Sequence, residues 1–168
     1  MSKEKALVEK IERKFGVKGK AERKRIWINI RKENMIDLCR YLKELGFEHL
    51  SAISVTDFIK RGKYELVYVV WSYHDNIAII VKSEIEREKP VISSVTEIWK
   101  ESAQIHEREL HELFGVEFEG NADLSELFLE NWKESPPFRK DFNWREYVGK
   151  KYYYKQDEKE KIYLEAGI

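Results

Sequence analysis

The sequence predicts an α+β fold: a mostly antiparallel sheet with flanking helices, followed by short helices and an extended C-terminal arm. Residues 3–15 and 34–45 repeat apolar side chains at helical spacing. Three runs within residues 50–82 have strand patterns and are joined by connections of hairpin length. Pro90 then interrupts the chain, and the apolar segments after it are short and helix-like. Helices that precede and follow a meander of strands favour the α+β class.

Residues 3–15 form the first expected helix. Leu7, Ile11 and Phe15 recur every four residues between charged positions, which gives an amphipathic helix with a thin apolar stripe. Gly16 supplies its end, because glycine readily adopts the left-handed conformation that closes a helix.

A strand and a second helix come next. Isoleucine alternates with other residues over residues 25–30, which is the period of a strand with one buried face. In the helix that follows, Asn34 and Asp37 fit a capping box and Gly46 supplies the stop. Its apolar face contains Met35, Leu38, Cys39, Leu42 and Leu45. The cysteine on that face is expected to be a core residue and not a nucleophile.

Residues 50–59, 64–74 and 77–82 read as three strands. The connections at 60–63 and 75–76 are rich in turn-forming residues, so an antiparallel meander is the economical pairing. The middle run is almost continuously apolar, which predicts a central strand covered on both faces.

The chain after Pro90 predicts short helices. Ser94 can cap a turn over residues 95–99, and residues 103–114 have the length and composition of a helix that ends at Gly115.

Two further features precede the C-terminal arm. Asp123 and Glu126 predict the start of another short helix that ends near Leu129. The Pro136–Pro137 pair is expected to force an extended path.

No internal repeat or low-complexity linker divides the chain. We therefore expect one domain in which residues 1–90 form an N-terminal α+β part and residues 91–142 pack on it. Residues 143–168, which alternate charged and tyrosine-rich stretches, are expected to form the C-terminal arm.

The charges cancel overall but not locally. The chain has 31 Lys and Arg and 31 Asp and Glu among 168 residues. Residues 1–25 nevertheless carry a net charge of +6 and residues 97–134 a net charge of −8, with 0 over residues 26–96 and +2 over residues 135–168. Such asymmetry concerns partners and electrostatic steering rather than the fold.

Composition excludes several classes of protein. One cysteine cannot form a disulfide framework, nor can it supply the roughly four thiolates that normally hold an iron–sulfur cluster. The longest apolar runs, residues 66–71 and 77–81, are far shorter than a membrane span, and no secretory signal is visible. We therefore expect a soluble intracellular protein, and the high share of charged residues, 37%, is typical of a thermophile.

Metal hydrolysis is one alternative that the sequence raises. His106 and His111 resemble a zinc motif, but they are five residues apart, which separates them by roughly 140° around a helix. Glu107 and His111 then form an ordinary helix pair, and His106 is a core or interface residue. The neighbouring carboxylates of Glu109 and Glu112 are more typical of a solvated or partner-binding face than of an acid–base pair.

A free-standing RNA-binding module is the other alternative. It would use a basic N-terminus and a tyrosine-rich tail, in which cations stand next to rings that can stack on bases. These residues are Lys18, Lys20, Arg23, Lys24, Arg25 and Trp27, and Lys150, Lys151, Tyr152, Tyr153 and Tyr154. The zero net charge and the acidic residues 97–134 count against phosphate binding, and no RRM or KH signature is present.

Residues 91–142 carry four short motifs in a fixed order. They are Ser94-Val95-Thr96 with Ile98-Trp99; His106-Glu107-Arg108-Glu109 leading to Leu113-Phe114-Gly115-Val116; Phe118, Gly120 and Asp123-Leu124; and Arg139-Lys140-Asp141-Phe142. In these motifs the chain resembles the thirty-kilodalton, or C, subunit family of complex I-type NADH:quinone oxidoreductases and its counterparts in archaeal membrane-bound [NiFe] hydrogenases. Two positions depart from the family pattern: Asn121-Ala122 replaces a His-Pro pair, and Pro136-Pro137-Phe138 replaces His-Pro-Leu.

The resemblance implies a cofactor-free structural subunit with no catalytic or metal-binding residue of its own. It implies a place in the soluble arm of a membrane-bound complex, on the cytoplasmic face of the membrane. The implied partners are a [NiFe]-hydrogenase-like large subunit and iron–sulfur subunits, which this chain would position for electron transfer. The interface residues expected from the motifs are Glu107, Arg108, Glu109, Phe114, Gly115, Arg139, Lys140 and Asp141. Whether Arg108 and Arg139 pair within the chain or with a partner is left open by the sequence.

Overall fold

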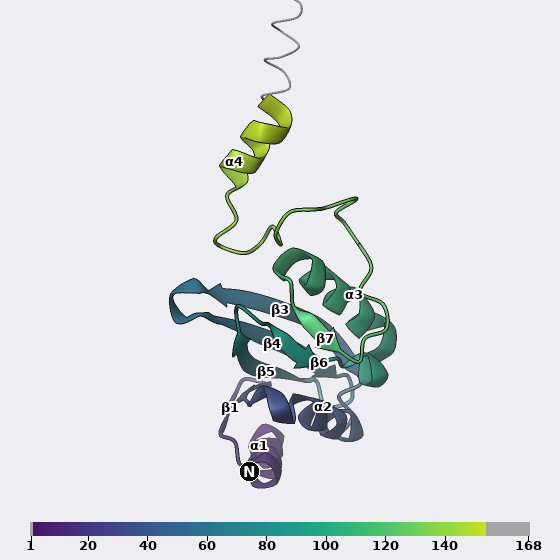
Figure 1. Ribbon diagram of the computed structural model, residues 1–168. Helices are drawn as coiled ribbons and strands as arrows, with labels where there is room; N and C mark the ends of the chain where they lie inside the picture. Colours follow the sequence, from purple (N-terminus) through teal and green to yellow (C-terminus); the bar gives the residue numbers. More distant parts are fainter. Residues whose placement is uncertain (1, 154–168) are drawn as a thin grey trace, which may run out of the picture.

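A five-stranded sheet forms the centre of the protein, which we describe from a computed structural model for residues 2–153 (Figure 1). The strands lie in the order β1-β2-β5-β4-β3. Their bounds are Gly19–Glu22 for β1, Arg25–Asn29 for β2, His49–Phe58 for β3, Lys63–Ser72 for β4 and Ile77–Glu86 for β5. Every neighbouring pair is antiparallel except β2 and β5, which run parallel. The helix after β2 carries the chain to the far edge of the sheet, so the meander returns beside β2 in the same direction.

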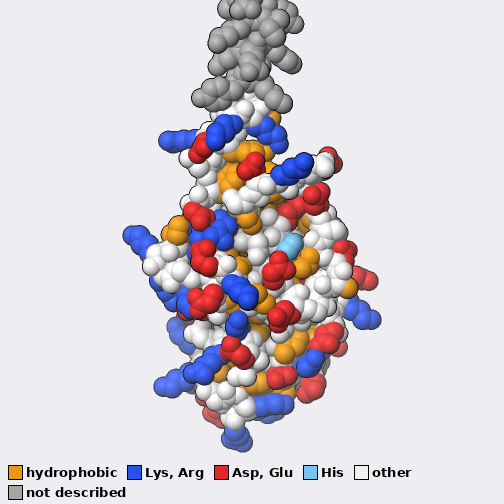
Figure 2. Space-filling view, in the orientation of Figure 1, with side chains coloured by type: hydrophobic (Ala, Val, Ile, Leu, Met, Phe, Trp, Pro, Cys, Tyr) orange, Lys and Arg blue, Asp and Glu red, His pale blue; other side chains and the backbone are white. Residues whose placement is uncertain are grey.

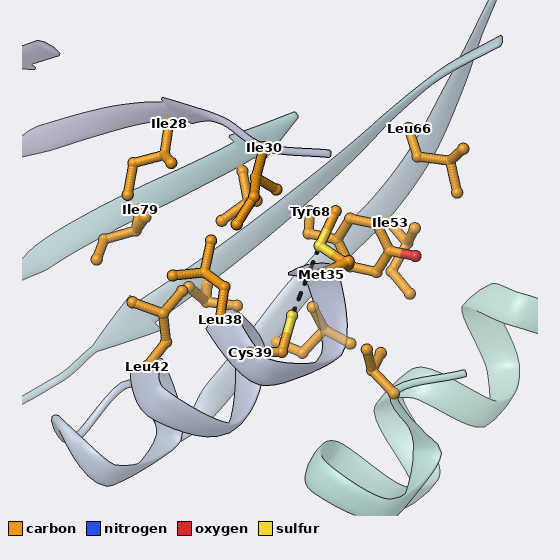
Figure 3. Close-up of a cluster of buried hydrophobic side chains, with 14 of the residues drawn as sticks. Ile28, Ile30, Met35, Leu38, Cys39, Leu42, Ile53, Leu66, Tyr68 and Ile79 are labelled. Carbon is orange, nitrogen blue, oxygen red and sulfur yellow. Dashed lines mark hydrogen bonds between the residues drawn. The ribbon is translucent and has the colours of Figure 1, made fainter. Parts of the chain in front are cut away.

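Three helices pack against this sheet: α1 at Lys3–Phe15, α2 at Met35–Glu44 and α3 at Thr96–Phe114. Figure 3 shows the apolar face of α2 turned toward side chains from the strands. The helix residues of this core are Met35, Leu38, Cys39 and Leu42, and they meet Ile28, Ile53, Leu66, Tyr68 and Ile79 of the sheet. Helix α1 lies beside α2, where the rings of Phe15 and Tyr41 are 5.8 Å apart. These contacts confirm the predicted α+β class and the predicted core position of the cysteine.

The remaining elements follow the sheet. Strands β6 at Val91–Ser93 and β7 at Glu117–Glu119 form a small parallel pair that flanks α3. Helix α4 at Trp144–Val148 continues into a π-helical turn at Gly149–Tyr153 and projects away from the body (Figure 1). Short 3-10 turns occupy Lys32–Asn34 and Ile59–Arg61. The end of the predicted arm, residues 154–168, lies outside the described residues. No helix among residues 2–153 has the length and apolar character needed to span a bilayer.

The prediction of a capping box at α2 is wrong. Asn34 makes no side-chain cap hydrogen bond, because it closes the preceding 3-10 turn at φ −100° and ψ 1° instead of adopting the extended backbone of an N-cap. Helix α1, by contrast, has the predicted bounds and ends at Gly16, whose φ is 65°.

Only one face of the sheet is deeply buried. The side chains of β4 alternate between buried residues and half-buried ones, so the prediction that this strand is covered on both faces holds for one face alone. Strand β5 extends to Glu86, beyond the predicted end at residue 82, and its last four residues alternate between buried and exposed side chains. Strands β1, β6 and β7 were not predicted from the sequence, since each has only three or four residues.

Helix α3 joins the two helical pieces predicted at 95–99 and 103–114. A kink separates them, where Trp99 has φ −120° and Lys100 has φ 36°. The N-cap position of α3 is Val95, one residue after the predicted cap, and it makes no side-chain cap hydrogen bond. The Ser94 hydroxyl still accepts from the Thr96 N–H at 3.1 Å. The indole of Trp99 donates to the carbonyl of Phe47 at 3.2 Å, which fixes the first piece of α3 against the end of α2.

Candidate partner-binding surface

Glu107 lies in the middle of α3, and its side chain is fully buried. Its carboxylate accepts three hydrogen bonds, each 2.8 Å long, from the Ser94 hydroxyl, the Val95 N–H and the Asn121 side-chain amide. Burial raises the pKa of this carboxyl, and the three donors oppose that rise. Glu107 therefore joins the start of α3 to the loop after β7 from inside the domain. This placement differs from the expectation that it presents charge on the surface and pairs with His111.

Glu112, one turn and a half further along α3, holds the backbone of a distant loop. Its carboxylate accepts from the N–H groups of Leu127, Phe128 and Leu129 at 2.9–3.2 Å. Partial burial would raise the pKa of Glu112, but these three donors hold it below its usual range. The short helix predicted from Asp123 to near Leu129 is not formed, because the N–H groups of Leu127, Phe128 and Leu129, which would make its first intrahelical hydrogen bonds, donate to Glu112 instead.

Arg108 holds the same loop by the backbone carbonyl groups of the loop. Its guanidinium donates to the carbonyl of Ser125 at 3.1 Å and to that of Glu126 at 2.7 Å. The side-chain amide of Gln104 donates to the carbonyl of Asp123. Arg108 is therefore occupied within its own chain, while the neighbouring Glu109 remains partly exposed. The polar side of α3 thus organises residues 120–129, which we call the clamped loop.

The end of α3 receives the next segment of chain. Gly115 adopts φ 76°, and a Cβ atom at this position would lie only 2.9 Å from Cγ of Pro136. The N–H of Phe138 donates to the carbonyl of Leu113 at 2.9 Å. The ring of Phe114 packs edge-on against Phe138, with centroids 5.8 Å apart. Pro136 therefore enters a turn against the helix end and not the extended path predicted for the proline pair.

A buried charge cluster fixes the last motif. Arg87 is only 3% exposed, and its guanidinium forms two hydrogen bonds with each of two carboxylates: 2.8 and 3.1 Å to Asp57, and 2.7 and 3.1 Å to Asp141. The N–H of Lys140 donates to Asp57 at 2.9 Å, and Arg139 donates to Asp141 at 3.2 Å. Arg139 therefore pairs within its own chain.

The buried charge cluster lowers the pKa of both of its aspartates. Hydrogen bonds from Arg87 and then Arg139 hold the pKa of Asp141 far below its usual range. Burial would raise the pKa of Asp57, but Arg87 and the Lys140 N–H lower it further than burial raises it. Neither Arg87 nor Asp57 is among the residues predicted from the sequence. The one available signal was that Asp57 falls in the buried register of its strand, two residues after Val55 and four after Ile53.

Four aromatic rings form a small cluster at the base of the arm. They are Trp132, Phe142, Trp144 and Tyr147, with centroids 4.9–6.1 Å apart. The indole of Trp144 donates to the carbonyl of Pro137 at 3.0 Å. Figure 2 shows hydrophobic side chains gathered at this end of the body with charged groups around them. Phe128, Phe138 and Trp144 are 62%, 55% and 44% exposed, so aromatic surface is displayed along the clamped loop and the base of the arm.

The residues of the metal-hydrolase alternative do not converge. His111 lies with Nδ1 3.0 Å from the carbonyl of Val116, whereas His106 has Nδ1 4.0 Å from Glu109. Among residues 2–153, no group of three or more His, Cys, Asp or Glu side chains is arranged to hold a metal ion. Cys39 is fully buried with Sγ 3.8 Å from Met35 Sδ, and burial raises the pKa of its thiol.

Of the basic residues in the RNA-binding alternative, two lie at the tip of the hairpin of β1 and β2, and Lys150 and Lys151 lie in the π-helical turn after α4. Arg23 and Lys24 form the turn between β1 and β2, with φ of 46° and 63°. Trp27 is half-buried and pairs across the strands with Lys20, whose ammonium lies 3.1 Å from Glu22. The tail tyrosines from residue 154 onward lie outside the described residues.

Comparison with known proteins finds a match over most of the chain. Residues 28–148 match the family described as the respiratory-chain NADH dehydrogenase 30 kDa subunit. The C subunit of the F(420)H(2) dehydrogenase of Methanosarcina mazei is 33% identical over 120 residues, covering 70% of this chain and 75% of the relative. A C subunit of the NADH-quinone oxidoreductase of Rhizobium meliloti is 34% identical over 122 residues, covering 70% of this chain and 66% of the relative.

Solved structures give the same result. A chain of the membrane-bound sulfane sulfur reductase, an archaeal respiratory membrane complex, superposes with a TM-score of 0.82 at 32% identity and covers 90% of this chain and 92% of that one. A trypsin-resistant fragment of Nqo5 superposes with a TM-score of 0.61 at 26% identity, covering 71% of this chain and 98% of the fragment.

Proposed function

Since the chain belongs to the family of the respiratory-chain NADH dehydrogenase 30 kDa subunit, we propose that it is a non-catalytic subunit of a membrane-bound, complex I-like oxidoreductase. Its role is to hold a [NiFe]-hydrogenase-like large subunit beside iron–sulfur subunits, so that electrons pass between centres that those subunits carry. Its place is the soluble arm of the complex, peripheral to the cytoplasmic face of the membrane. The likeness to C subunits of two dehydrogenases and to a chain of an archaeal respiratory complex supports this proposal.

The proposal rests on one observation: most charged motif residues form hydrogen bonds within their own chain and fix its loops. Charged side chains of α3 hold the backbone of the clamped loop, and Arg87 holds Asp141 just before the arm. The surface around these contacts displays the exposed aromatic rings of Phe128, Phe138 and Trp144. Exposed aromatic side chains on a rigid support are typical of a protein interface and supply no reactive group.

The interface predicted from the motifs takes a more specific form in this proposal. Glu109 and Lys140 are accessible and contact the partner directly. The other motif residues shape the surface from beneath by fixing the loop, the helix end and the arm. They are Glu107, Arg108, Phe114, Gly115, Arg139 and Asp141.

Affinity purification from native membranes in mild detergent tests the proposal. We expect a hydrogenase-like large subunit to co-purify with the wild-type chain. Lys140→Glu reverses an exposed charge that makes its hydrogen bond to the buried cluster through the backbone N–H and acts on Asp57 with its side chain only through space. It should therefore loosen the complex without unfolding the domain. Lys10→Glu, on the exposed side of α1, is the matched control. Absence of a large subunit from the wild-type preparation would contradict the proposed function.

A further inference from the structure

Strand β2 leaves the sheet before its neighbour β5 ends. Their ladder pairs Arg25–Asn29 with residues 78–82, and a last hydrogen bond of 2.9 Å runs from the N–H of Ile30 to the carbonyl of Lys82. Strand β5 continues to Glu86, paired on its other side with β4. One edge of its last four residues is therefore open.

The pairing fixes which backbone groups face this open edge. Even-numbered residues of β5 point their N–H and C=O toward β2, as the bond from the Ala78 N–H to the Lys24 carbonyl shows at 3.0 Å. Odd-numbered residues point toward β4, and the Arg87 N–H accordingly donates to the Gly62 carbonyl. The N–H and C=O of Glu84 and Glu86 must then face the vacated side. No backbone hydrogen bond described within residues 2–153 uses them.

A cavity of about 700 Å³ lies along this edge. Glu84, Ile85 and Glu86 form one wall, and Arg31 and Lys32, where the chain leaves β2, form another. We call this cavity the β5 notch. A short extended segment bound there would lie about 4.8 Å from β5 if it joined the sheet.

Charges around the β5 notch favour recognition through the main chain. Along its outer rim Lys63 pairs with Glu86, and Arg61 pairs with Glu84, so these acids are already neutralised. Arg31 and Glu33 both line the β5 notch and form no ion pair within the described part of the chain, and the side chain of Arg31 is exposed. An extended segment that bears a carboxylate near Arg31 would complement both the open backbone and this cation.

We propose that the β5 notch binds an extended segment of a partner subunit, which adds as a strand beside residues 84–86 and places an acidic group near Arg31. The proposal rests on the proposed function, because it takes the partner from the same complex. Arg87, directly after Glu86, holds Asp141, so the end of the β5 notch is one residue away from the buried cluster that fixes the segment before the arm. Strand addition satisfies main-chain groups that only water could otherwise satisfy.

Amide hydrogen exchange tests this inference on the assembled complex and on the isolated chain. In the complex, we expect exchange at the amides of Glu84 and Glu86 to slow by about tenfold or more. The amides of Ser83 and Ile85 bond to β4 in both states and serve as internal controls. Equal rates at Glu84 and Glu86 in the two samples would overturn the inference while leaving the proposed function intact, because the complex would still have formed.

Two variants sharpen the test. Glu84→Pro removes the donor that faces the β5 notch and spares the bonds to β4, so protection of the Glu86 amide should be lost. Glu84→Ala keeps the donor and should retain the protection. If Glu84→Pro fails to fold, the exchange rates of Glu84 and Glu86 in the wild-type complex and the wild-type isolated chain still test the inference.

Two other occupants give different results, and either would overturn the proposal. Protection that rises with the concentration of the isolated chain would mean that a second copy fills the β5 notch. Protection in the isolated chain that disappears when residues 154–168 are removed would mean that the chain's own C-terminal segment fills it.

Discussion

Glu107 and Arg87 carry opposite charges in the interior, and each is held by groups from segments far apart in the sequence. Glu107 receives donors from the start of α3 and from Asn121. Arg87 meets the carboxylates of Asp57 on β3 and of Asp141 in the segment before the arm. In both cases hydrogen bonds to nearly every polar atom offset the free energy cost of burying the charge. Removing one partner leaves part of that cost uncompensated.

Asn121 stands where the family pattern has a histidine, and its side-chain amide donates to Glu107. Asn121→Asp would place a second carboxylate within hydrogen-bond distance of Glu107, so we expect the free energy of unfolding to fall by about 2 kcal/mol at pH 7. Asn121→Ala, the control, loses one donor without adding charge and should cost about 1 kcal/mol.

The pH dependence of Asn121→Asp has a definite sign. Repulsion raises the folded-state pKa of the carboxyl pair, so the folded variant takes up a proton as the pH falls. Its deficit relative to wild type should therefore shrink between neutral pH and about pH 4, where the unfolded chain is also protonated. Denaturant unfolding at several pH values measures this, and a deficit that does not change with pH would contradict the proposed contact with Glu107.

Arg87 and Asp141 are expected to differ sharply in their effects on stability. Arg87→Met leaves Asp57 buried without its main partner and should lower the free energy of unfolding by about 3 kcal/mol. Asp141 is 47% exposed, so Asp141→Asn should cost only about 1 kcal/mol or less. Chemical denaturation of both variants gives the comparison, and equal losses would contradict the central role of Arg87.

Acid should weaken this cluster in the wild type. The pKa values of Asp57 and Asp141 are lowered on folding, so their stabilising contribution is complete above the unfolded pKa of about 4 and is lost as the pH falls toward the folded values. Arg87→Met removes the main cause of both shifts and should flatten this loss.

At the scale of elements, the clamped loop and the hairpin of β1 and β2 show how local sequence preferences are overridden. Asp123 and Glu126 have the spacing of a helix start, yet the loop takes its shape from Glu112 and Arg108 on another element. At the hairpin, Arg23 and Lys24 both adopt positive φ, although glycine and asparagine suit this turn far better.

Glu112→Gln should loosen the clamped loop without unfolding the protein. A neutral amide accepts fewer and weaker hydrogen bonds from Leu127, Phe128 and Leu129, so we expect their amides to exchange about tenfold faster. The global free energy of unfolding should change by about 1 kcal/mol. The amides of β4 are the control, and unchanged exchange in the loop would contradict the clamp.

Acid should also loosen the contact between Glu112 and the clamped loop. The pKa of Glu112 is lowered on folding, so its contribution is present above the ordinary glutamate pKa and is lost as the pH falls through the folded value.

The hairpin turn offers a stabilising change. Replacing Arg23-Lys24 with Asn-Gly should raise the free energy of unfolding by about 1 kcal/mol, because both residues then favour the left-handed conformation. Thermal unfolding measures it. The reversed pair, Gly-Asn, is the matched control and should gain less. A loss of stability in the Asn-Gly variant would show that the side chains at this tip make a stabilising contribution.

At the scale of the whole molecule, one core supports a body from which the arm projects. The sheet, α1, α2 and α3 share a single set of buried side chains. The arm is joined to this body through Phe138, Trp144 and the Arg87 cluster. We therefore expect the body to resist proteolysis better than the arm does.

Limited digestion with trypsin tests this difference. Cleavage should come first at Lys133, Arg145, Lys150 and Lys151, which are exposed and lie outside the strands, and should leave the body intact. Asp141→Asn, by releasing the arm from Arg87, should speed this cleavage several-fold, as followed by mass spectrometry. Early cuts within the sheet would contradict the picture of one stable body.

The sequence by itself determined which segments form α1, α2 and the three long strands, because their apolar periods are set by neighbours a few residues away. It also determined the family, through motifs in residues 91–142. Only the tertiary structure decided that Glu107 is internal, that Arg108 and Arg139 pair within the chain, and that β2 and β5 run side by side. These facts depend on contacts between residues far apart in the chain, where burial and hydrogen bonding outweigh the local preferences that a sequence pattern records.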